Sequence, residues 1–272
     1  MTSSPAAQGL RAALRGGRVW GDLVVVDEVG STNVEVTRLA EPWSVVLARR
    51  QTAGRGRRGR SWSDSEGLGL ACSMLVPGTP PDDLGWVPLA VGLGVRDCLS
   101  GLDLPTSLKW PNDVLADIAG EERKVCGILC EARPGRAKGG PAASPAAGAT
   151  EVVVGVGVNL DHDRGQLPVE TATSLRLLAE EHAVAPPDRA EIAPSLLDAV
   201  RDRLEQVGSD SLRSDYRAAC ATIGRQVVVH RPDGSVLHGV GEDVAPDGRL
   251  VVLADGSSAT VSAGDVQHVR HR

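Results

Sequence analysis

The stretch Gln51-Thr52-Ala53-Gly54-Arg55-Gly56-Arg57-Arg58-Gly59-Arg60-Ser61-Trp62 combines four arginines with three glycines in one short segment. Glycine lets the backbone approach a ligand closely and take positive φ angles. Arginine carries a fixed charge on a planar fork that matches phosphate or carboxylate. Because the whole chain has a formal net charge of -6, these residues (54–60, the basic loop) predict a local site for an anion.

Two common nucleotide-binding motifs nearly match the basic loop. Gly54-x-Gly56-x-x-Gly59 fits a dinucleotide fingerprint, and Gly54-x4-Gly59-Arg60-Ser61 resembles a P-loop with Arg in place of Lys. Both motifs need a helix directly after the glycines. Residues 61–70 have no helical period and lead into a strand-like run over 70–76, so neither motif is favoured. A solvated basic hairpin and a nucleic-acid-binding loop remain open, the latter opposed by 2% aromatic residues and a pI near 5.6.

The composition indicates a globular protein with a sizeable core. A length of 272 residues allows one large domain or a domain with a small module, and 42% hydrophobic residues support a core although Phe is absent. The five cysteines form no CxxC pair, and no signal peptide is evident, which predicts a reducing cytoplasmic location. No histidine motif predicts a protein-bound metal, and no apolar run has the length of a membrane span.

Hydrophobic periodicity predicts a mixture of helices and strands before residue 222. Thr32 and Glu35 have capping-box spacing at a predicted helix start, and capping alone could explain Ser31 and Thr32. Residues 133–149 are rich in Gly, Ala and Pro and predict a mobile surface insertion. The predicted helices are 8–15, 84–100, 173–182, 188–207 and 209–220, and the predicted strands are 23–26, 44–48, 70–76, 106–110, 114–118, 124–132 and 152–158.

The pattern changes after Thr222. Short strand-like runs are separated by Pro-Asp-Gly at 232–234 and 246–248 and by Asp-Gly at 255–256, which are turn sequences. They predict a small β-barrel, and thus two domains, residues 1–221 and 222–272. No helix-turn-helix precedes the first predicted strand.

Four further segments accompany the basic loop, each with a plain structural interpretation when taken singly. They are Ser31-Thr32-Asn33 (a cap), Lys109-Trp110-Pro111-Asn112-Asp113 (a turn), Lys124-Val125-Cys126-Gly127-Ile128-Leu129 (a strand-edge lysine) and Val154-Gly155-Val156-Gly157-Val158-Asn159 (a bulged strand). Together and in this order, STN, Q-x-x-GRGRRGR-x-W, KWPND, K-x-x-GIL-x-E and G-x-G-x-N resemble the biotin protein ligase family. The resemblance covers most of residues 20–270. Cys126 stands where the family usually has a small residue, and the DNA-binding module of repressor-type members is missing.

The resemblance implies an α+β fold. Its catalytic domain has a mixed sheet like those of class II aminoacyl-tRNA synthetases and lipoate ligases, and its terminal domain is an SH3-like barrel. Members of the family use biotin, ATP and Mg²⁺ to form biotinyl-5′-AMP and then pass biotin to a lysine of a biotin carboxyl carrier protein. The expected partners include no specific DNA and no membrane, and the expected state is a monomer or weak homodimer.

The resemblance also assigns roles to individual residues. Ser31, Thr32 and Gln51 would hydrogen-bond the ureido ring. Arg55, Gly56 and Arg57 would wrap the acyl-adenylate and the ATP phosphates, and Trp62 would pack or stack at the loop base. Asn33 and Gly54 would also belong to the substrate-binding residues. Gly127, Gly155, Gly157 and Asn159 would border the pocket, with Gly155 and Gly157 beneath the valeryl chain. Lys124 would contact the biotin carboxylate and the α-phosphate, and Asn112 and Asp113 would place Mg²⁺ or the acceptor amine. The expected catalytic group is Lys124, Arg57, Asp113 and Asn112.

Three alternatives remain at this point. A lipoate-protein ligase uses a related architecture, although a site built around ureido hydrogen bonds rejects an analogue lacking them by ~10⁴-fold. A nucleic-acid-binding, biotin-responsive regulator is opposed by the acidic net charge. A non-enzymatic biotin sensor does not need Lys124.

Overall fold

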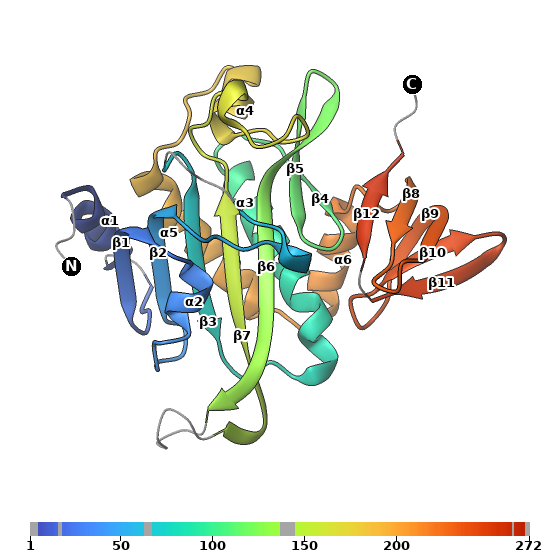
Figure 1. Cartoon of the computed structure of the whole chain (residues 1–272), viewed down its shortest axis with the longest axis horizontal. Helices are drawn as coiled ribbons and strands as arrows, with labels where there is room; N and C mark the ends of the chain where they lie inside the picture. The colour runs from blue at the N-terminus through green and yellow to red at the C-terminus, as the bar shows by residue number, and fades with distance from the viewer. Residues whose placement is uncertain (1–4, 16–17, 63–66, 137–144, 263, 270–272) are drawn as a thin grey trace.

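The computed structural model describes residues 5–15, 18–62, 67–136, 145–262 and 264–269. The elements up to α6 form a seven-stranded mixed sheet with helices, and the following strands form a separate five-stranded antiparallel sheet (Figure 1). This arrangement confirms the α+β fold class with an SH3-like terminal unit. The division between residues 221 and 222 stays a prediction.

The large sheet places strands from distant parts of the chain side by side. Among the described strands, only β1 and β2 pair in parallel, and the other neighbours in this sheet are antiparallel. In spatial order the strands are β1 (Leu23–Val29), β2 (Val45–Gln51), β3 (Leu70–Val76), β7 (Pro145–Val158), β6 (Glu121–Arg136), β5 (Asp113–Ile118) and β4 (Ser107–Lys109).

The hairpin of β6 and β7 is longer than the sequence suggested. Arg133 pairs with Glu151 and Pro134 with Thr150 in the ladder, and the Arg133 guanidinium contacts the Glu151 carboxylate at 2.9 Å. Strands β6 and β7 therefore extend into the predicted insertion, as far as Arg136 and Pro145, which pair with each other. The mobility of this segment stays a prediction. Residues 137–144 lie outside the described residues.

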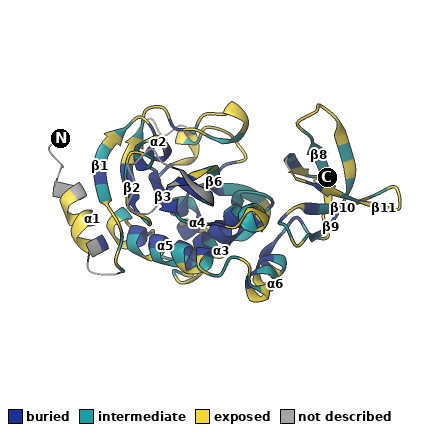
Figure 2. Ribbon diagram, turned by 90° about the horizontal axis from the view of Figure 1, so that it is seen from below, coloured by how far each residue is buried: buried dark blue, intermediate teal, exposed yellow. Residues whose placement is uncertain are grey.

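Helices cover both faces of the large sheet (Figure 2). The helix α3 (Val87–Ser100), preceded by a 3₁₀ turn (Pro81–Trp86), packs between the sheet and α5 (Arg189–Leu204). Gly94 permits this close approach, because an added Cβ would lie 2.5 Å from Val200 Cα. The short α2 (Thr32–Val36) packs on the opposite face, against β2 and β3. The other helices are α1 (Pro5–Arg15), α4 (Leu175–Glu181) and α6 (Asp210–Ala219), with 3₁₀ turns at Arg57–Gly59 and Arg164–Gln166.

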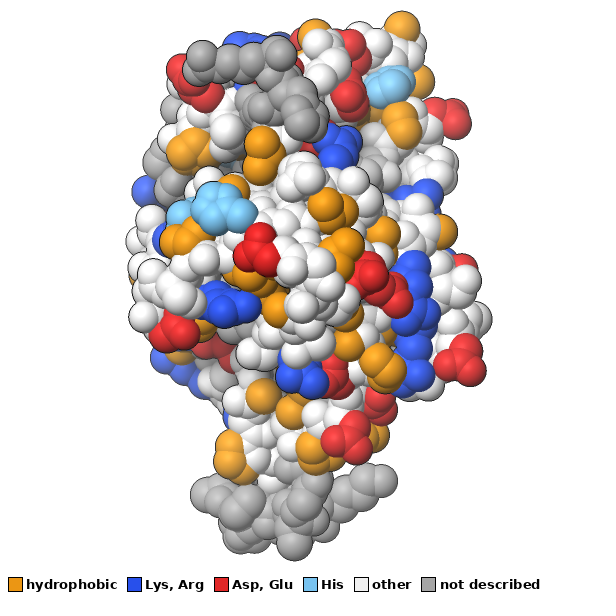
Figure 3. Space-filling view, turned by 90° about the vertical axis from the view of Figure 1, so that its right-hand side faces the viewer, with side chains coloured by type: hydrophobic (Ala, Val, Ile, Leu, Met, Phe, Trp, Pro, Cys, Tyr) orange, Lys and Arg blue, Asp and Glu red, His pale blue; other side chains and the backbone are white. Residues whose placement is uncertain are grey.

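The terminal unit, residues 222–269, is called the terminal barrel below. Its strands are β8 (Gln226–His230), β9 (Val236–Val244), β10 (Leu250–Ala254), β11 (Ser257–Val261) and β12 (Asp265–His268), in the order β11-β10-β9-β8-β12. Two tryptophans hold it against the rest of the molecule: Trp86 Nε1 donates to Pro246 O at 2.7 Å, and Trp110 Nε1 donates to Gly248 O at 3.0 Å. The barrel side of the surface mixes positive, negative and hydrophobic side chains (Figure 3).

Candidate functional site

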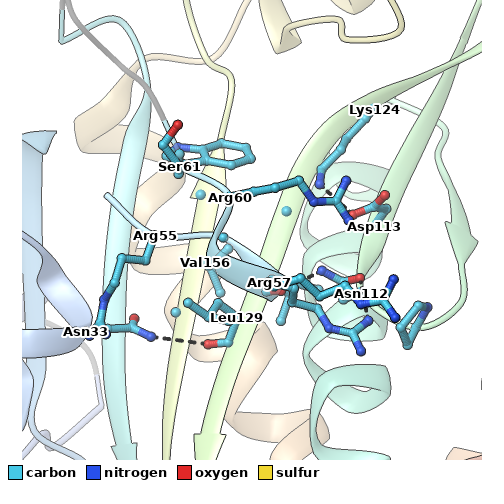
Figure 4. A pocket seen from close by; sticks show the side chains of 18 of the residues that line it. Asn33, Arg55, Arg57, Arg60, Ser61, Asn112, Asp113, Lys124, Leu129 and Val156 are labelled. Atoms are coloured by element: carbon cyan, nitrogen blue, oxygen red, sulfur yellow. Dashed lines mark hydrogen bonds and ion pairs between the residues drawn. The ribbon is translucent and has the colours of Figure 1, made fainter. Parts of the chain in front are cut away.

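A cavity of about 130 Å³ lies between the basic loop and the α2 side of the sheet (Figure 4). Residues of the terminal barrel also line it. The cavity brings together every predicted site residue except Gly54 and Asn159. The predicted residues that line it are Ser31, Thr32, Asn33, Gln51, Arg55, Gly56, Arg57, Trp62, Asn112, Asp113, Lys124, Gly127, Gly155 and Gly157. They meet because β2, β3, β7, β6 and β5 are successive neighbours in the sheet.

At one end of the cavity lies a polar cluster made by Thr32, Asn33, Gln51 and Ser73. The first three line the cavity, and Ser73 is buried behind them. The backbone N–H and the hydroxyl of Thr32 both donate to Gln51 Oε1, at 2.8 Å and 3.0 Å. The Ser73 hydroxyl lies 2.8 Å from Thr32 Oγ1 and 2.6 Å from Asn33 Oδ1. Because these side chains hold one another in a buried place, the cluster presents fixed donors and acceptors to whatever enters the cavity.

The capping interpretation of this segment is wrong. Ser31, not Thr32, occupies the N-cap position of α2, and its side chain makes no capping hydrogen bond. Thr32 turns its hydroxyl toward Gln51 instead. Tertiary contacts across the sheet thus override a local capping pattern that the spacing of Thr32 and Glu35 suggested.

The basic loop forms a tight turn at the other end of the cavity. Gly56 N donates to Arg60 O at 2.6 Å, and the turn passes through positive φ at Arg58 (57°) and Gly59 (73°). Arg57 Nη1 donates to Asn112 Oδ1 at 3.1 Å. Burial lowers the pKa of the Arg57 guanidinium from its ordinary value, and Asp113 opposes this effect. Arg57 therefore remains a cation that is partly withdrawn from water.

Two other arginines of the loop reach carboxylates on its borders. Arg55 Nη1 lies 3.6 Å from Glu131 Oε1, and Arg60 Nη2 lies 3.3 Å from Asp265 Oδ1 of the terminal barrel. These pairs are substantially exposed, so each contributes little to stability. They hold the loop near the cavity without fixing it strongly.

Lys124 and Asp113 form the charged centre between the two ends. Lys124 Nζ lies 2.6 Å from Asp113 Oδ1 and 5.6 Å from the centre of the Trp62 ring. The β5–β6 register shifts between Val114 and Leu115, and such a bulge re-aims the side chains beside it. A lone amine is thus placed next to a carboxylate at the cavity wall.

The glycines of β6 and β7 leave space that other side chains fill. A Cβ at Gly155 would collide with Asn33, and one at Gly157 would lie 2.5 Å from the Trp62 ring. A Cβ at Gly127 would lie 2.7 Å from Cζ3 of the same ring. In this structure, therefore, Asn33 and Trp62 lie over the glycines that we expected to border a chain-like ligand. Gly54 lies at the loop base, where its carbonyl accepts from Trp62 N at 2.9 Å.

A second cavity of about 900 Å³ adjoins the first. The two share lining residues that include Trp62, Lys109, Asp113 and Lys124. Asn159 lines the second cavity and donates from Nδ2 to Thr173 O at 2.9 Å, so it holds the segment before α4. The predicted residue Asn159 therefore belongs to the neighbouring space and not to the first cavity.

Several contributors were not singled out from the sequence. Ser73 lies in an apolar strand and pairs with Gly155 on the neighbouring strand. Its polar side chain within that apolar run was the sequence signal that could have indicated a role in the site. Glu131 accepts a hydrogen bond from Asn33 Nδ2 at 2.7 Å. In the sequence it stood out only as the last residue of the K-x-x-GIL-x-E motif. Gly264, Asp265 and Val266 of the terminal barrel also line the first cavity, which only the tertiary structure reveals.

Other chemistries find no support within the described residues. No group of three or more His, Cys, Asp or Glu side chains there could hold a metal ion, and no described helix has the length and apolarity of a membrane span. All five cysteines are free. Burial raises the pKa of Cys72 and of Cys130 to about 12, so neither thiol is ionised at neutral pH.

Comparison with known proteins agrees with this geometry. Residues 30–141 match the biotin/lipoate A/B protein ligase family, and residues 222–269 match the biotin protein ligase C terminal domain. The biotin–[acetyl-CoA-carboxylase] ligase of Mycobacterium tuberculosis is 38% identical over 97% of this chain and 95% of its own length. The bifunctional ligase/repressor BirA of Escherichia coli is 28% identical over 90% of this chain and 74% of its own length.

A solved structure shares the architecture as well. The biotin protein ligase of Aquifex aeolicus in complex with biotin and ATP has a TM-score of 0.71 and 25% identity, covering 93% of this chain and 100% of the other. Since a relative above 30% identity matches nearly end to end, the chain belongs to the biotin protein ligase family.

Proposed function

We propose that this chain uses ATP to convert biotin to biotinyl-5′-AMP and then transfers biotin to a lysine of a carboxyl carrier domain. The observation that carries this proposal is the position of Lys124, which lines both cavities and lies between the buried polar cluster and the larger space. The names of the relatives and the ligands of the Aquifex aeolicus complex support the same reaction.

The polar cluster suits the ureido ring of biotin. A buried ring with amide-like donors and acceptors needs paired partners, because each unpaired group costs about 1–3 kcal/mol. Gln51, Thr32 and Ser73 already form a hydrogen-bonded set at this end of the first cavity. The biotin carboxylate would then extend toward Lys124, and the nucleotide would occupy the second cavity.

The first half-reaction brings two anions together. The carboxylate oxygen of biotin attacks the α-phosphorus of ATP, the phosphoanhydride bond breaks, and pyrophosphate leaves. Fixed cations lower this barrier by electrostatics and positioning. Lys124 and Arg57 lie on the cavity wall for this purpose, and in the structure each is already paired with an oxygen of the Asn112–Asp113 segment. When substrate binds, oxygens of the carboxylate and the phosphates can replace the oxygens of Asn112 and Asp113. Lys124 and Arg57 then keep an oxygen partner throughout.

The second half-reaction consumes the mixed anhydride. The acceptor amine attacks the biotinyl carbonyl, an amide bond forms, and AMP leaves. Asp113, at the junction of the two cavities, is the carboxylate that we assign to orient the amine. No enzyme nucleophile takes part in either step.

The first cavity must enlarge to hold biotin. Its volume of about 130 Å³ lies below the ~300–1,000 Å³ typical of ligand sites. We infer that Trp62 moves off Gly127 and Gly157 with the basic loop and then closes over the substrate. The weak, exposed ion pairs of Arg55 and Arg60 permit that movement.

Mg²⁺ is expected to arrive with ATP. The residues present fit this ion, since Asn112 and Asp113 offer oxygen ligands beside the cavity. Mg²⁺ in such sites usually takes one or two carboxylates and the substrate phosphates, and it neutralises phosphate charge there. An oxygen of Asn112 is already bonded to Arg57, and an oxygen of Asp113 is already paired with Lys124. We therefore assign most of the ligands of Mg²⁺ to the ATP phosphates and water, and few to the protein.

One assay tests the reaction and its substrate. The protein is mixed with ATP, an apo carrier domain and either labelled biotin or labelled lipoate. Covalent biotin on the carrier, with little lipoate, is the expected result, because the polar cluster is built for a ureido ring. Lipoate transfer would favour the alternative ligase. ATP-independent biotin binding without transfer would indicate a sensor. Selective DNA binding that resists physiological salt would favour a regulator.

A further inference from the structure

The segment between α6 and β8 lies beside the edge strand β4. Ala221 N donates to Leu108 O at 2.8 Å, as in a ladder. Just beyond the end of β4, the N–H of Trp110 donates to the hydroxyl of Thr222 at 3.0 Å. Thr222 has no exposed surface. One buried hydroxyl therefore holds the backbone of the Lys109–Asp113 segment, whose side chains line both cavities.

The Thr222 hydroxyl also contacts the terminal barrel. It lies 3.0 Å from Nε2 of His268 on β12, and His268 Nδ1 lies 3.0 Å from Glu122 Oε2 on β6. Because Thr222 Oγ1 accepts from Trp110, its own hydrogen is available to His268 Nε2. The other ring nitrogen then carries hydrogen and donates to the Glu122 carboxylate. Each group in this chain therefore donates one hydrogen bond to the next, from Trp110 through Thr222, and His268 donates in turn to Glu122.

A carboxylate, a histidine and a hydroxyl in sequence resemble a hydrolase triad. Here the hydroxyl is fully buried and already accepts from a backbone N–H. Thr222 lines neither cavity, so its hydroxyl has no access to a substrate there. The chain of hydrogen bonds therefore serves to hold geometry and not to supply a nucleophile.

Burial favours the neutral form of His268. Burial lowers the pKa of His268 from its ordinary value, Lys109 on β4 and Arg225 before β8 act in the same direction, and Glu122 opposes them. Arg225 also pairs with Glu122 at 3.0 Å. Protonation would put a hydrogen on Nε2, facing the Thr222 hydroxyl, whose own hydrogen would lose its acceptor.

We propose that Thr222 and His268 are positioning residues for the proposed reaction, through which the terminal barrel sets the Lys109–Asp113 segment for the nucleotide. This inference rests on the proposed function. The proposal predicts different effects on ATP and on biotin. The polar cluster, assigned to biotin, lies on α2, β2 and β3 and has no part in the hydrogen bonds that join Thr222 and His268. The terminal barrel thus acts on the nucleotide side of the site.

The first test replaces the hydroxyl while keeping the side-chain shape. Thr222→Val is expected to raise the KM for ATP in biotinyl-AMP formation about ten-fold, the effect of one lost buried hydrogen bond. The biotin Kd, measured by calorimetry without ATP, should stay at the wild-type value. Thr222→Ser restores the hydroxyl and should restore the KM. His268→Gln, which keeps an acceptor for Thr222 but loses Glu122, should fall between them, and His238→Gln on the exposed face of β9 is the control.

The second readout is the pH dependence. As pH falls from 7 through the lowered pKa of His268, wild type should lose ATP affinity in a step that Thr222→Val lacks. A wild type that forms no biotinyl-AMP would refute the proposed function itself. An active wild type with unchanged KM and pH profile in Thr222→Val would refute this inference alone, as would equal losses of biotin and ATP binding. If Thr222→Val does not fold, an unaltered pH step in His268→Gln overturns the inference.

Discussion

The polar cluster and the basic loop border the same cavity but are built in opposite ways. Thr32, Asn33 and Ser73 are 3%, 3% and 1% exposed, carry no charge and bond to one another within the sheet and α2. Arg55 and Arg60 have side chains that are 49% and 62% exposed and are held by single long ion pairs. A rigid neutral end is suited to recognising a shape, and an adjustable charged end is suited to enclosing a reacting phosphate.

This difference separates binding from chemistry. Preorganised buried hydrogen bonds discriminate between substrates before reaction, whereas cations that engage the phosphate mainly lower the barrier or retain the intermediate. Mutations in the polar cluster should therefore change biotin affinity, and mutations in the basic loop should change the formation or release of biotinyl-AMP. The same change from both kinds of mutation would contradict this comparison.

The largest effect is expected at the charged centre. Lys124→Ala should slow biotinyl-AMP formation by on the order of 10²–10³, the usual cost of losing one group that stabilises a transition state. Biotin affinity should fall much less than this rate, because the polar cluster still holds the ureido ring. The rate is measured as labelled adenylate in single turnovers, with Lys138→Ala as the control outside every motif. A rate near wild type would remove Lys124 from its assigned role.

The next effect concerns retention of the intermediate. Arg57→Gly removes a charge-assisted hydrogen bond worth ~1.5–3 kcal/mol, which corresponds to roughly ten- to a hundred-fold faster release of biotinyl-AMP. Released adenylate should biotinylate lysines of serum albumin at matched adenylate production. Arg58→Gly adds a glycine to the same loop at an exposed position with φ of 57°. Arg58 also lines the cavity, so this variant controls for loop flexibility and loss of charge without removing the bond to Asn112. Equal albumin labelling by wild type and Arg57→Gly would show that the loop does not retain the intermediate.

A smaller effect is expected in the polar cluster. Ser73→Ala removes the hydroxyl that contacts Thr32 Oγ1 and Asn33 Oδ1. Thr32 keeps its bond to Gln51, but Asn33 Oδ1 loses this donor, which should loosen the cluster and weaken biotin binding about ten-fold. Ser44→Ala is the control, because Ser44 is equally buried and hydrogen-bonded. Its partners Asp22 and Glu41 do not line the cavity, whereas Thr32 and Asn33, the partners of Ser73, do. Replacement of Ser44 should lower the melting temperature without changing the biotin Kd. Wild-type biotin affinity in Ser73→Ala would contradict the assignment of the cluster.

The smallest effect is the response to salt. Raising ionic strength from 0.1 M to 1 M shortens the Debye length from about 10 Å to 3 Å. The KM for ATP should rise a few-fold, since Arg55 and Arg60 are exposed charges, while the biotin Kd measured without ATP should stay nearly constant. A parallel weakening of both would mean that the two ends are not electrostatically distinct.

The sequence located most of the site because its motifs fall on adjacent strands. The basic loop, Lys124 and the Gly155–Gly157 pair were recognised by residue type and order, and the fold class followed from them. What the sequence could not show depends on contacts between distant residues. Ser73 is one polar residue in an apolar strand, and its role is set by Thr32 and Asn33 across the sheet.

Local patterns were also misleading where tertiary contacts compete with them. The spacing of Thr32 and Glu35 fits a capping box, yet Gln51 on the neighbouring strand takes the Thr32 hydroxyl. The composition of residues 133–149 suggested an insertion, but ladder pairing extends β6 and β7 into it. The contribution of Asp265 to the first cavity depends on how the terminal barrel docks, which no local pattern encodes.

The most direct test of the account measures two quantities on the same preparations of Ser73→Ala and Arg57→Gly. These are biotin affinity by calorimetry without ATP, and biotinyl-AMP formation and release at saturating biotin and ATP. The account predicts that Ser73→Ala loses biotin affinity but forms and retains adenylate normally when saturated. Arg57→Gly should bind biotin normally but release adenylate rapidly. If both variants lose biotin affinity and retention to the same extent, the separation of a recognition end from a reaction end is contradicted.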